Sequence, residues 1–137
     1  PPDVVPQQFD RIVARARAIE AEAGRQLPLA FKEIGYPSSP VNAASETTQA
    51  AFFANFFASW DRYRDEVPYV SVVRLYDLSQ EEAQRSADFF LGDPPAVPPA
   101  VAREYREYVR TLGLITFDGR EKAAFAALRE ATEARGW

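Results

Sequence analysis

A short apolar segment, residues 29–33, constrains the fold of this chain more than any other feature. Pro28 precedes it and Gly35 follows it closely, so the segment is too short for a helix and predicts a strand. The strand ends on Glu33 and passes into a loop, residues 35–44, that contains Gly, Pro and Ser. Parallel α/β folds build active sites at the carboxyl ends of their strands. Glu33 is therefore the first candidate functional residue.

The surroundings of Glu33 leave two interpretations open. Strict alternation places Leu29, Phe31 and Glu33 on one face of the strand. A carboxylate beside Leu and Phe must end in a polar pocket, because an unpaired buried charge is costly. Glu33 is then either a catalytic group or one half of a structural ion pair with Lys32 or an arginine. The length of the following loop favours a functional role.

Helical patterns surround this strand. Apolar residues recur at helical spacing from Phe9 to Ile19, and Gly24 is a plausible end for that helix. Ser45 is a good N-cap for a second helix, whose aromatic stripe runs to Trp60. The 3/4 spacing of that stripe is typical of a helix that faces a core rather than a ligand.

A second strand is predicted over residues 67–77, where β-branched residues dominate, as in parallel strands that are covered on both faces. Arg74 interrupts it, and a charged side chain among Val and Leu needs a partner. If Arg74 faces the same cleft as Glu33, it can pair with that carboxylate or with the oxygen atoms of a ligand. A structural ion pair is the alternative.

The remaining chain is predicted to be helical. Ser79 and Glu82 form a capping box for a helix that reaches about Leu91. Further helices are expected over 100–111 and 121–135, with a turn at Asp118-Gly119 between them. Tyr105 and Tyr108 in the first of these can line a pocket, although packing is the simpler interpretation.

Composition limits the chemistry. The 137 residues contain no Cys and no His, which excludes disulfides, thiol nucleophiles, the usual zinc sites and the Ser-His-Asp mechanism from this chain. Acid–base chemistry then falls to Glu, Asp, Tyr or Lys. There is no cluster of metal ligands and no Gly-rich phosphate loop, so we expect no metal ion and no other cofactor. The net charge of −4 and the lack of a long apolar run argue against nucleic-acid and membrane partners.

The predicted order is α-β-α-β-α-α-α, in one α/β domain over residues 1–137. Two parallel strands cannot form a sheet that is buried on both faces, since ordinary sheets have several strands. We therefore expect further strands upstream in the same protein or in another chain. The absence of Met, even at position 1, points the same way.

Four motifs, taken in order, resemble one family. They are Glu33-Ile-Gly-Tyr-Pro-Ser-Ser, a helix that ends near Trp60-Asp61, Val67-Pro-Tyr-Val followed by Asp77-Leu-Ser, and Leu112-Gly-Leu followed by Asp118-Gly-Arg. Together they resemble the C-terminal part of a bacterial TIM (β/α)8-barrel glycoside hydrolase, of the retaining galactanase- and cellulase-like clan. The first motif is fairly specific, and the others support it by their order.

The resemblance implies a fold and an activity. Residues 29–33 are similar to the seventh barrel strand, 70–76 to the eighth and 121–135 to the last helix. In this family the Glu that ends the seventh strand is the nucleophile, a role that would fall to Glu33. Retaining hydrolysis also needs an acid about 5–5.5 Å away, and the family's fourth strand, which is not in this sequence, carries it. The segment alone is expected to be inactive, and the resemblance suggests a secreted or periplasmic location.

The expected substrate is a plant- or microbial-type polysaccharide or oligosaccharide with β-glycosidic bonds, and the expected substrate-binding residues are Tyr36, Arg74 and Tyr76. Tyr36 either borders the sugar site or packs within its loop. Barrels of this clan commonly place Trp on the eighth strand, whereas this chain has Arg74 there, which favours an acidic or otherwise polar substrate group or the loss of activity. Two other functions therefore stay open: a non-catalytic carbohydrate-binding or structural barrel, and a self-standing helical interaction module.

Overall fold

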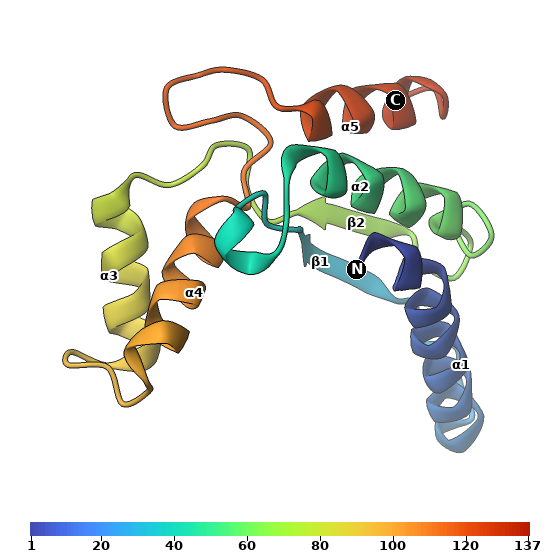
Figure 1. Ribbon diagram of the computed structural model, residues 1–137. Coiled ribbons are helices and arrows are strands. Elements are labelled where there is room, and N and C mark those ends of the chain that lie inside the picture. The colour runs from blue at the N-terminus through green and yellow to red at the C-terminus, as the bar shows by residue number, and fades with distance from the viewer.

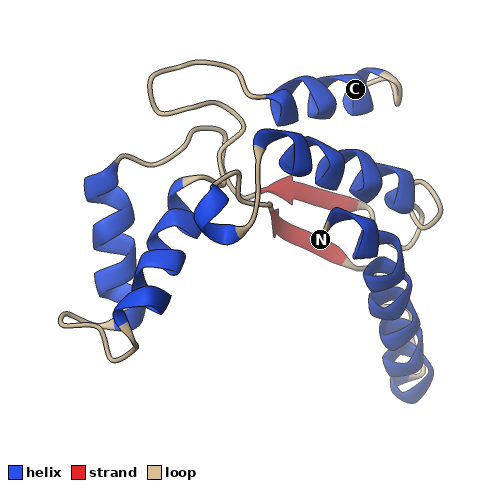
Figure 2. Cartoon of the chain, viewed as in Figure 1, coloured by secondary structure: helices blue, strands red, loops and turns tan.

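The computed structural model describes residues 1–137 as a mixed α/β fold with five α-helices and one small parallel sheet (Figures 1 and 2). The predicted α/β class and element order are confirmed, while the assignment to part of a TIM barrel stays a prediction. The elements are α1 (Val5–Ala23), β1 (Ala30–Ile34), α2 (Glu46–Trp60), β2 (Tyr69–Val72), α3 (Gln80–Leu91), α4 (Pro99–Arg110) and α5 (Ala123–Glu133), with short 3-10 helices at Pro2–Val4 and Pro40–Asn42.

Local sequence signals account for most helix ends. The Ser45 hydroxyl accepts a hydrogen bond from the Thr48 backbone N–H at 3.1 Å and begins α2. Ser79 and Glu82 form the predicted capping box of α3. Gly24 ends α1 with a φ of 66°, a left-handed conformation that glycine adopts without steric cost.

The hydrophobic core lies between α2 and its neighbours. Phe53, Phe56, Phe57 and Trp60 of α2 are buried, which confirms that the aromatic stripe faces a core. Helix α2 packs against α1 and α5, and Phe9 of α1 joins the same cluster. Burial of large aromatic side chains is the main favourable contribution to the stability of such a fold.

Only one face of the sheet is covered. Phe31 of β1 and the Val70 and Val72 side chains of β2 pack toward the core, whereas Ala30 and Tyr69 on these strands are exposed. Figure 1 shows α2 and α5 together on one side of the strands. Each strand is also paired along one edge only. The expectation that the second strand is covered on both faces is not met at Tyr69, whose side chain is 53% exposed.

A bulge disturbs the register at the end of β1. Phe31 pairs with Val70 and Ile34 with Val72, so three steps along β1 match two along β2. The extra residue lets Phe31 and Ile34 both face the core, although alternation would separate them. Glu33 absorbs the irregularity with a φ of 60°, a conformation that is uncommon for residues other than glycine.

The second strand is shorter than predicted. Strand β2 ends at Val72 rather than near Tyr76, and the last link to β1 is the hydrogen bond from the Val73 N–H to the Ile34 carbonyl at 2.9 Å. Beyond it the chain pairs instead with residues 113–115, through an isolated parallel bridge between Tyr76 and Ile115. Strand β2 ends here because its hydrogen-bonding partner, β1, passes into a loop at Gly35.

Helices α3 and α4 form a hairpin beyond the carboxyl ends of the strands (Figure 2). The chain leaves the sheet region at Leu78 and returns at Arg110. The Leu78 N–H donates to the Arg110 carbonyl at 3.0 Å, so the two ends of the hairpin lie side by side.

Candidate functional site

Glu33 lies at the carboxyl end of β1, as predicted, but its side chain is exposed rather than enclosed in a polar pocket. Its backbone N–H donates to the Ser71 hydroxyl of β2 at 3.4 Å. The carboxylate takes part in no ion pair, so the structural pairing with Lys32 or an arginine is absent. The bulge explains both corrections, because it turns this side chain away from the face of Phe31.

A hollow of about 270 Å³ lies between the end of the sheet and the α3–α4 hairpin. Glu33 and Arg74 both line it, so the structure brings these two predicted site residues to one cavity. The complete lining is Glu33, Gly35, Val73, Arg74, Ser86, Phe90, Tyr105, Tyr108, Val109 and Leu112. We call this cavity the hairpin hollow.

Arg74 is half-buried at the wall of the hairpin hollow. Its one hydrogen bond runs from Nη1 to the Val109 carbonyl at 3.3 Å. No carboxylate lies within ion-pair distance of its guanidinium, so the predicted structural ion pair is not formed. A guanidinium has five N–H donors, and most of those of Arg74 are therefore free for a ligand.

Aromatic side chains of the hairpin form the opposite wall. Phe90 of α3 and Tyr105 of α4 have ring centroids 6.2 Å apart, and Tyr108 lines the hollow one turn further along α4. Phe90 is 67% exposed and Tyr108 42% exposed. The two tyrosines therefore line a cavity, although the sequence favoured a packing role for them.

Tyr36 lies on a different side of Glu33. Its ring stacks on Phe52 with centroids 5.3 Å apart, which is the loop-packing role left open by the sequence. It also lines a second, largely apolar pocket of about 400 Å³ that Glu33 borders together with residues of α1. Glu33 thus separates two cavities, one shared with Arg74 and one with Tyr36.

Tyr76 lines neither of these cavities. Its side chain is 53% exposed, and its backbone bridges to Ile115. The shortening of β2 explains this position, because Tyr76 belongs to the segment that pairs with residues 113–115. Of the four predicted site residues, the structure therefore groups Glu33 with Arg74, Glu33 with Tyr36, and leaves Tyr76 apart.

A buried ion pair that sequence reasoning missed lies nearby. The Lys122 ammonium donates to the Asp77 carboxylate at 2.7 Å and to the Gly113 carbonyl at 2.9 Å. The same carboxylate accepts from the Gly113 N–H at 2.9 Å. Burial raises the pKa of Asp77, and the hydrogen bond from Lys122 acts in the opposite direction. Because both side chains are almost fully enclosed and well partnered, we assign this pair a structural role. We call the buried cluster around Asp77 and Lys122, together with the strands, the frame.

Gln49 of α2 completes the buried cluster. Its amide donates to the carbonyls of Tyr36, Thr111 and Gly113 at distances of 2.8–3.2 Å. It thereby ties the loop after Glu33 to the segment that follows α4. The sequence placed Asp77 at the polar end of the second predicted strand, but nothing in it marked Lys122 as the partner of Asp77.

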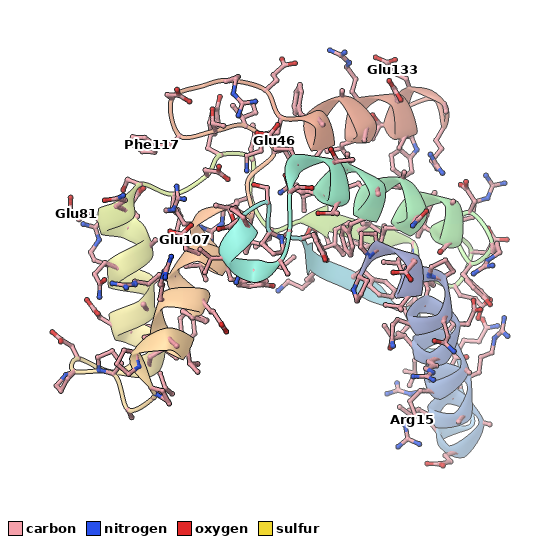
Figure 3. The ribbon with its side chains drawn as sticks, in the orientation of Figure 1. Arg15, Glu46, Glu81, Glu107, Phe117 and Glu133 are labelled. Carbon is pink, nitrogen blue, oxygen red and sulfur yellow. The ribbon has the colours of Figure 1, made fainter.

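A third set of contacts fixes the hairpin. Glu107 of α4, labelled in Figure 3, accepts from the Ser39 hydroxyl at 3.0 Å and from Arg110 at 2.8 Å. The hydrogen bond from Arg110 lowers the pKa of Glu107. Asn42 also donates to the Glu104 carbonyl at 2.9 Å. These bonds hold the hairpin, and so the wall of the hollow, against the loop that follows Glu33.

The site is therefore a cavity with one carboxylate, one unpaired guanidinium, two phenols and one exposed aromatic ring. No three potential metal-ligating side chains lie close together. No helix has the length and the apolar character that crossing a bilayer requires. Neither a protein-family model nor a curated protein nor a solved structure matches the chain.

Proposed function

We propose that this chain supplies the nucleophile, Glu33, of a retaining glycoside hydrolase that cleaves β-glycosidic bonds in plant- or microbial-type polysaccharides or oligosaccharides. The observation that carries the proposal is the conformation of Glu33. A non-glycine residue with a φ of 60° at a bulge costs free energy, and such outliers cluster at functional sites. The strain presents this carboxylate at the carboxyl end of a parallel strand, beside a cavity.

The chemistry needs two carboxyl groups. The Glu33 carboxylate attacks the anomeric carbon while an acid protonates the leaving glycosidic oxygen, giving a covalent glycosyl-enzyme. The second residue then deprotonates water, which attacks the same carbon and releases Glu33. The second carboxyl group belongs to a segment outside these residues, so the segment alone has no hydrolytic activity. Arg74 and the tyrosine rings of the hairpin hollow contact the sugar, and Tyr36 and Tyr76 are further candidate contacts.

The bare face of the sheet supports a larger barrel. A parallel sheet normally has both faces covered, whereas Ala30, Lys32 and Tyr69 are exposed here and both strands have an unpaired edge. The proposed partner is the other part of the barrel, upstream in the same protein or in another chain. A secreted or periplasmic location is part of this proposal, and no cofactor is required.

The test is made on the natural full-length protein. Glu33→Gln should abolish the hydrolysis of aryl β-glycosides, and the exposed Glu104→Gln is the matched control with normal rates. A 2-deoxy-2-fluoro aryl glycoside should leave one glycosyl group on the peptide that contains Glu33, with loss of the phenol. Hydrolysis at the normal rate in Glu33→Gln, or a label on another carboxylate, would rule out the nucleophile assignment.

A second candidate function is a barrel that binds carbohydrate without cleaving it. The segment 70–76, which resembles the eighth barrel strand, carries Arg74 instead of the usual Trp, and Tyr76 lies outside the hollow. This function predicts saturable binding of oligosaccharides that Glu33→Gln leaves unchanged, with no turnover and no covalent label.

A further inference from the structure

Arg74 is the one half-buried arginine whose guanidinium has no side-chain partner. Of the other half-buried arginines, Arg110 is paired with Glu107 and Arg135 with Asp61. Arg106 donates to the Gln84 side chain at 2.5 Å. Arg74 has only the backbone carbonyl of Val109. A half-buried guanidinium without an acidic partner loses hydration and gains little in return, so its position is costly unless a ligand supplies the partner.

The cavity in front of Arg74 has the size and lining for one sugar unit. Its volume of about 270 Å³ lies just below the range of pockets that hold drug-sized ligands. Tyr105 and Tyr108 offer ring faces and hydroxyl groups, and the Ser86 hydroxyl adds a further polar group. Rings of this kind pack against the apolar face of a ligand, while hydroxyl groups fix its orientation.

We infer that the hairpin hollow selects a uronic acid unit, a sugar whose carboxylate binds Arg74 while its anomeric carbon faces Glu33. The inference rests on the proposed function and names its substrate class. A guanidinium binds a carboxylate through two parallel hydrogen bonds, a geometry that a neutral hydroxymethyl group cannot reproduce. Glu33 and Arg74 line the same cavity. The positive charge of Arg74 therefore also offsets the repulsion between Glu33 and the carboxylate of the substrate.

A pair of substrates isolates this effect. Aryl β-glucuronides and β-galacturonides differ from the corresponding glucosides and galactosides only in a carboxylate in place of the hydroxymethyl group. We expect the natural full-length protein to hydrolyse an acidic member with the higher kcat/KM. Arg74→Met should lower that kcat/KM by about 10- to 100-fold and alter the neutral member by less than about 3-fold, while Arg74→Lys keeps part of the preference.

Arg106→Met is the matched control. Arg106 lies on α4 of the hairpin and is half-buried like Arg74, but it lines other cavities. The preference for the acidic substrate should survive this change. An equal loss for both substrates in Arg74→Met, or an equal effect of Arg106→Met, would overturn the inference, as would a wild-type preference for the neutral sugars.

A binding measurement separates this inference from the proposed function. Glucuronate and glucose are titrated into the Glu33→Gln protein, and the Arg74 Nε–H signal is followed by nuclear magnetic resonance. Glucuronate should shift that signal at concentrations at least about ten-fold below those of glucose. Selective binding of glucuronate together with no hydrolysis by the wild type would reject the glycosidase and retain the uronate site. Hydrolysis that depends on Glu33 but shows no Arg74-dependent preference would reject the uronate site alone.

Discussion

Two charged regions lie close together at the carboxyl ends of the strands, and they are built in opposite ways. In the buried cluster, Asp77 and Lys122 are almost inaccessible and each has several hydrogen-bond partners. In the hairpin hollow, Glu33 is exposed, Arg74 is half-buried, and neither is paired. The difference indicates that the first pair holds the frame together, whereas the charges of the second remain available for a ligand.

The largest expected effect comes from breaking the buried pair. Lys122→Met leaves the Asp77 carboxylate enclosed without a counter-charge, and the free energy of unfolding should fall by about 3–5 kcal/mol. Chemical denaturation measures it. The double variant Asp77→Leu with Lys122→Met should recover much of that loss, because no buried charge then remains. A single variant as stable as the wild type would show that the pair is not part of the frame.

Gly113 tests how tightly this cluster is packed. A Cβ at this position would overlap the backbone of Tyr76 and Asp77. Gly113→Ala should therefore cost about 1–3 kcal/mol of unfolding free energy, measured as a shift of the denaturation midpoint. Gly119→Ala, where the space is open and only a φ of 93° opposes the change, is the comparison. If Gly113→Ala loses no more than Gly119→Ala, the backbone of Tyr76 and Asp77 yields to the added Cβ and the cluster is not tightly packed.

The bulge at Glu33 predicts a gain in stability. Glycine adopts a φ of 60° without steric cost, so Glu33→Gly should raise the free energy of unfolding by about 1 kcal/mol while it removes hydrolysis. Lys32→Gly, one residue earlier in β1, is the control and should lose about 0.5–1 kcal/mol, as glycine does within a strand. Equal losses in the two variants would mean that the conformation of Glu33 stores no strain.

The smallest expected effect is a pH dependence at the hairpin contact. The pKa of Glu107 is lower in the folded protein than its ordinary value of 4.5 because Arg110 donates to it. Its contribution is therefore present above about pH 4.5 and is lost as the pH falls through the folded pKa. Glu107→Gln should flatten the acid limb of stability against pH by less than about 1 kcal/mol. Asp77, whose pKa is raised, acts with the opposite sign, so Asp77→Asn should not flatten this limb.

Local signals predicted the helices well. The side chains of Ser45, Ser79 and Glu82 satisfy the backbone groups at helix starts, and such bonds depend only on residues three apart. The aromatic spacing of α2 likewise predicted its buried face. These features form within one element, so the sequence contains all that is needed to infer them.

The site was less predictable because it depends on partners distant in the chain. The bulge that exposes Glu33 arises from its register with β2, and the end of β2 depends on where β1 stops. Lys122 and Asp77 are separated by 45 residues. Arg74 was correctly singled out as an unusual charge, but only the structure shows that no carboxylate lies within ion-pair distance of it.

The hydrogen bond between Leu78 and Arg110 has a consequence for how this protein can change. Because it joins residues 78 and 110, the segment 79–109 is a module that leaves the rest of the fold and rejoins it at one place. Substitutions inside that module can alter Phe90, Tyr105 and Tyr108, while Glu33, Asp77 and Lys122 lie outside the changed segment; Glu107 has to be kept, because it accepts the hydrogen bond from Ser39 in the loop after Glu33. The wall of the cavity can therefore diversify while the carboxylate and the frame beneath it stay the same.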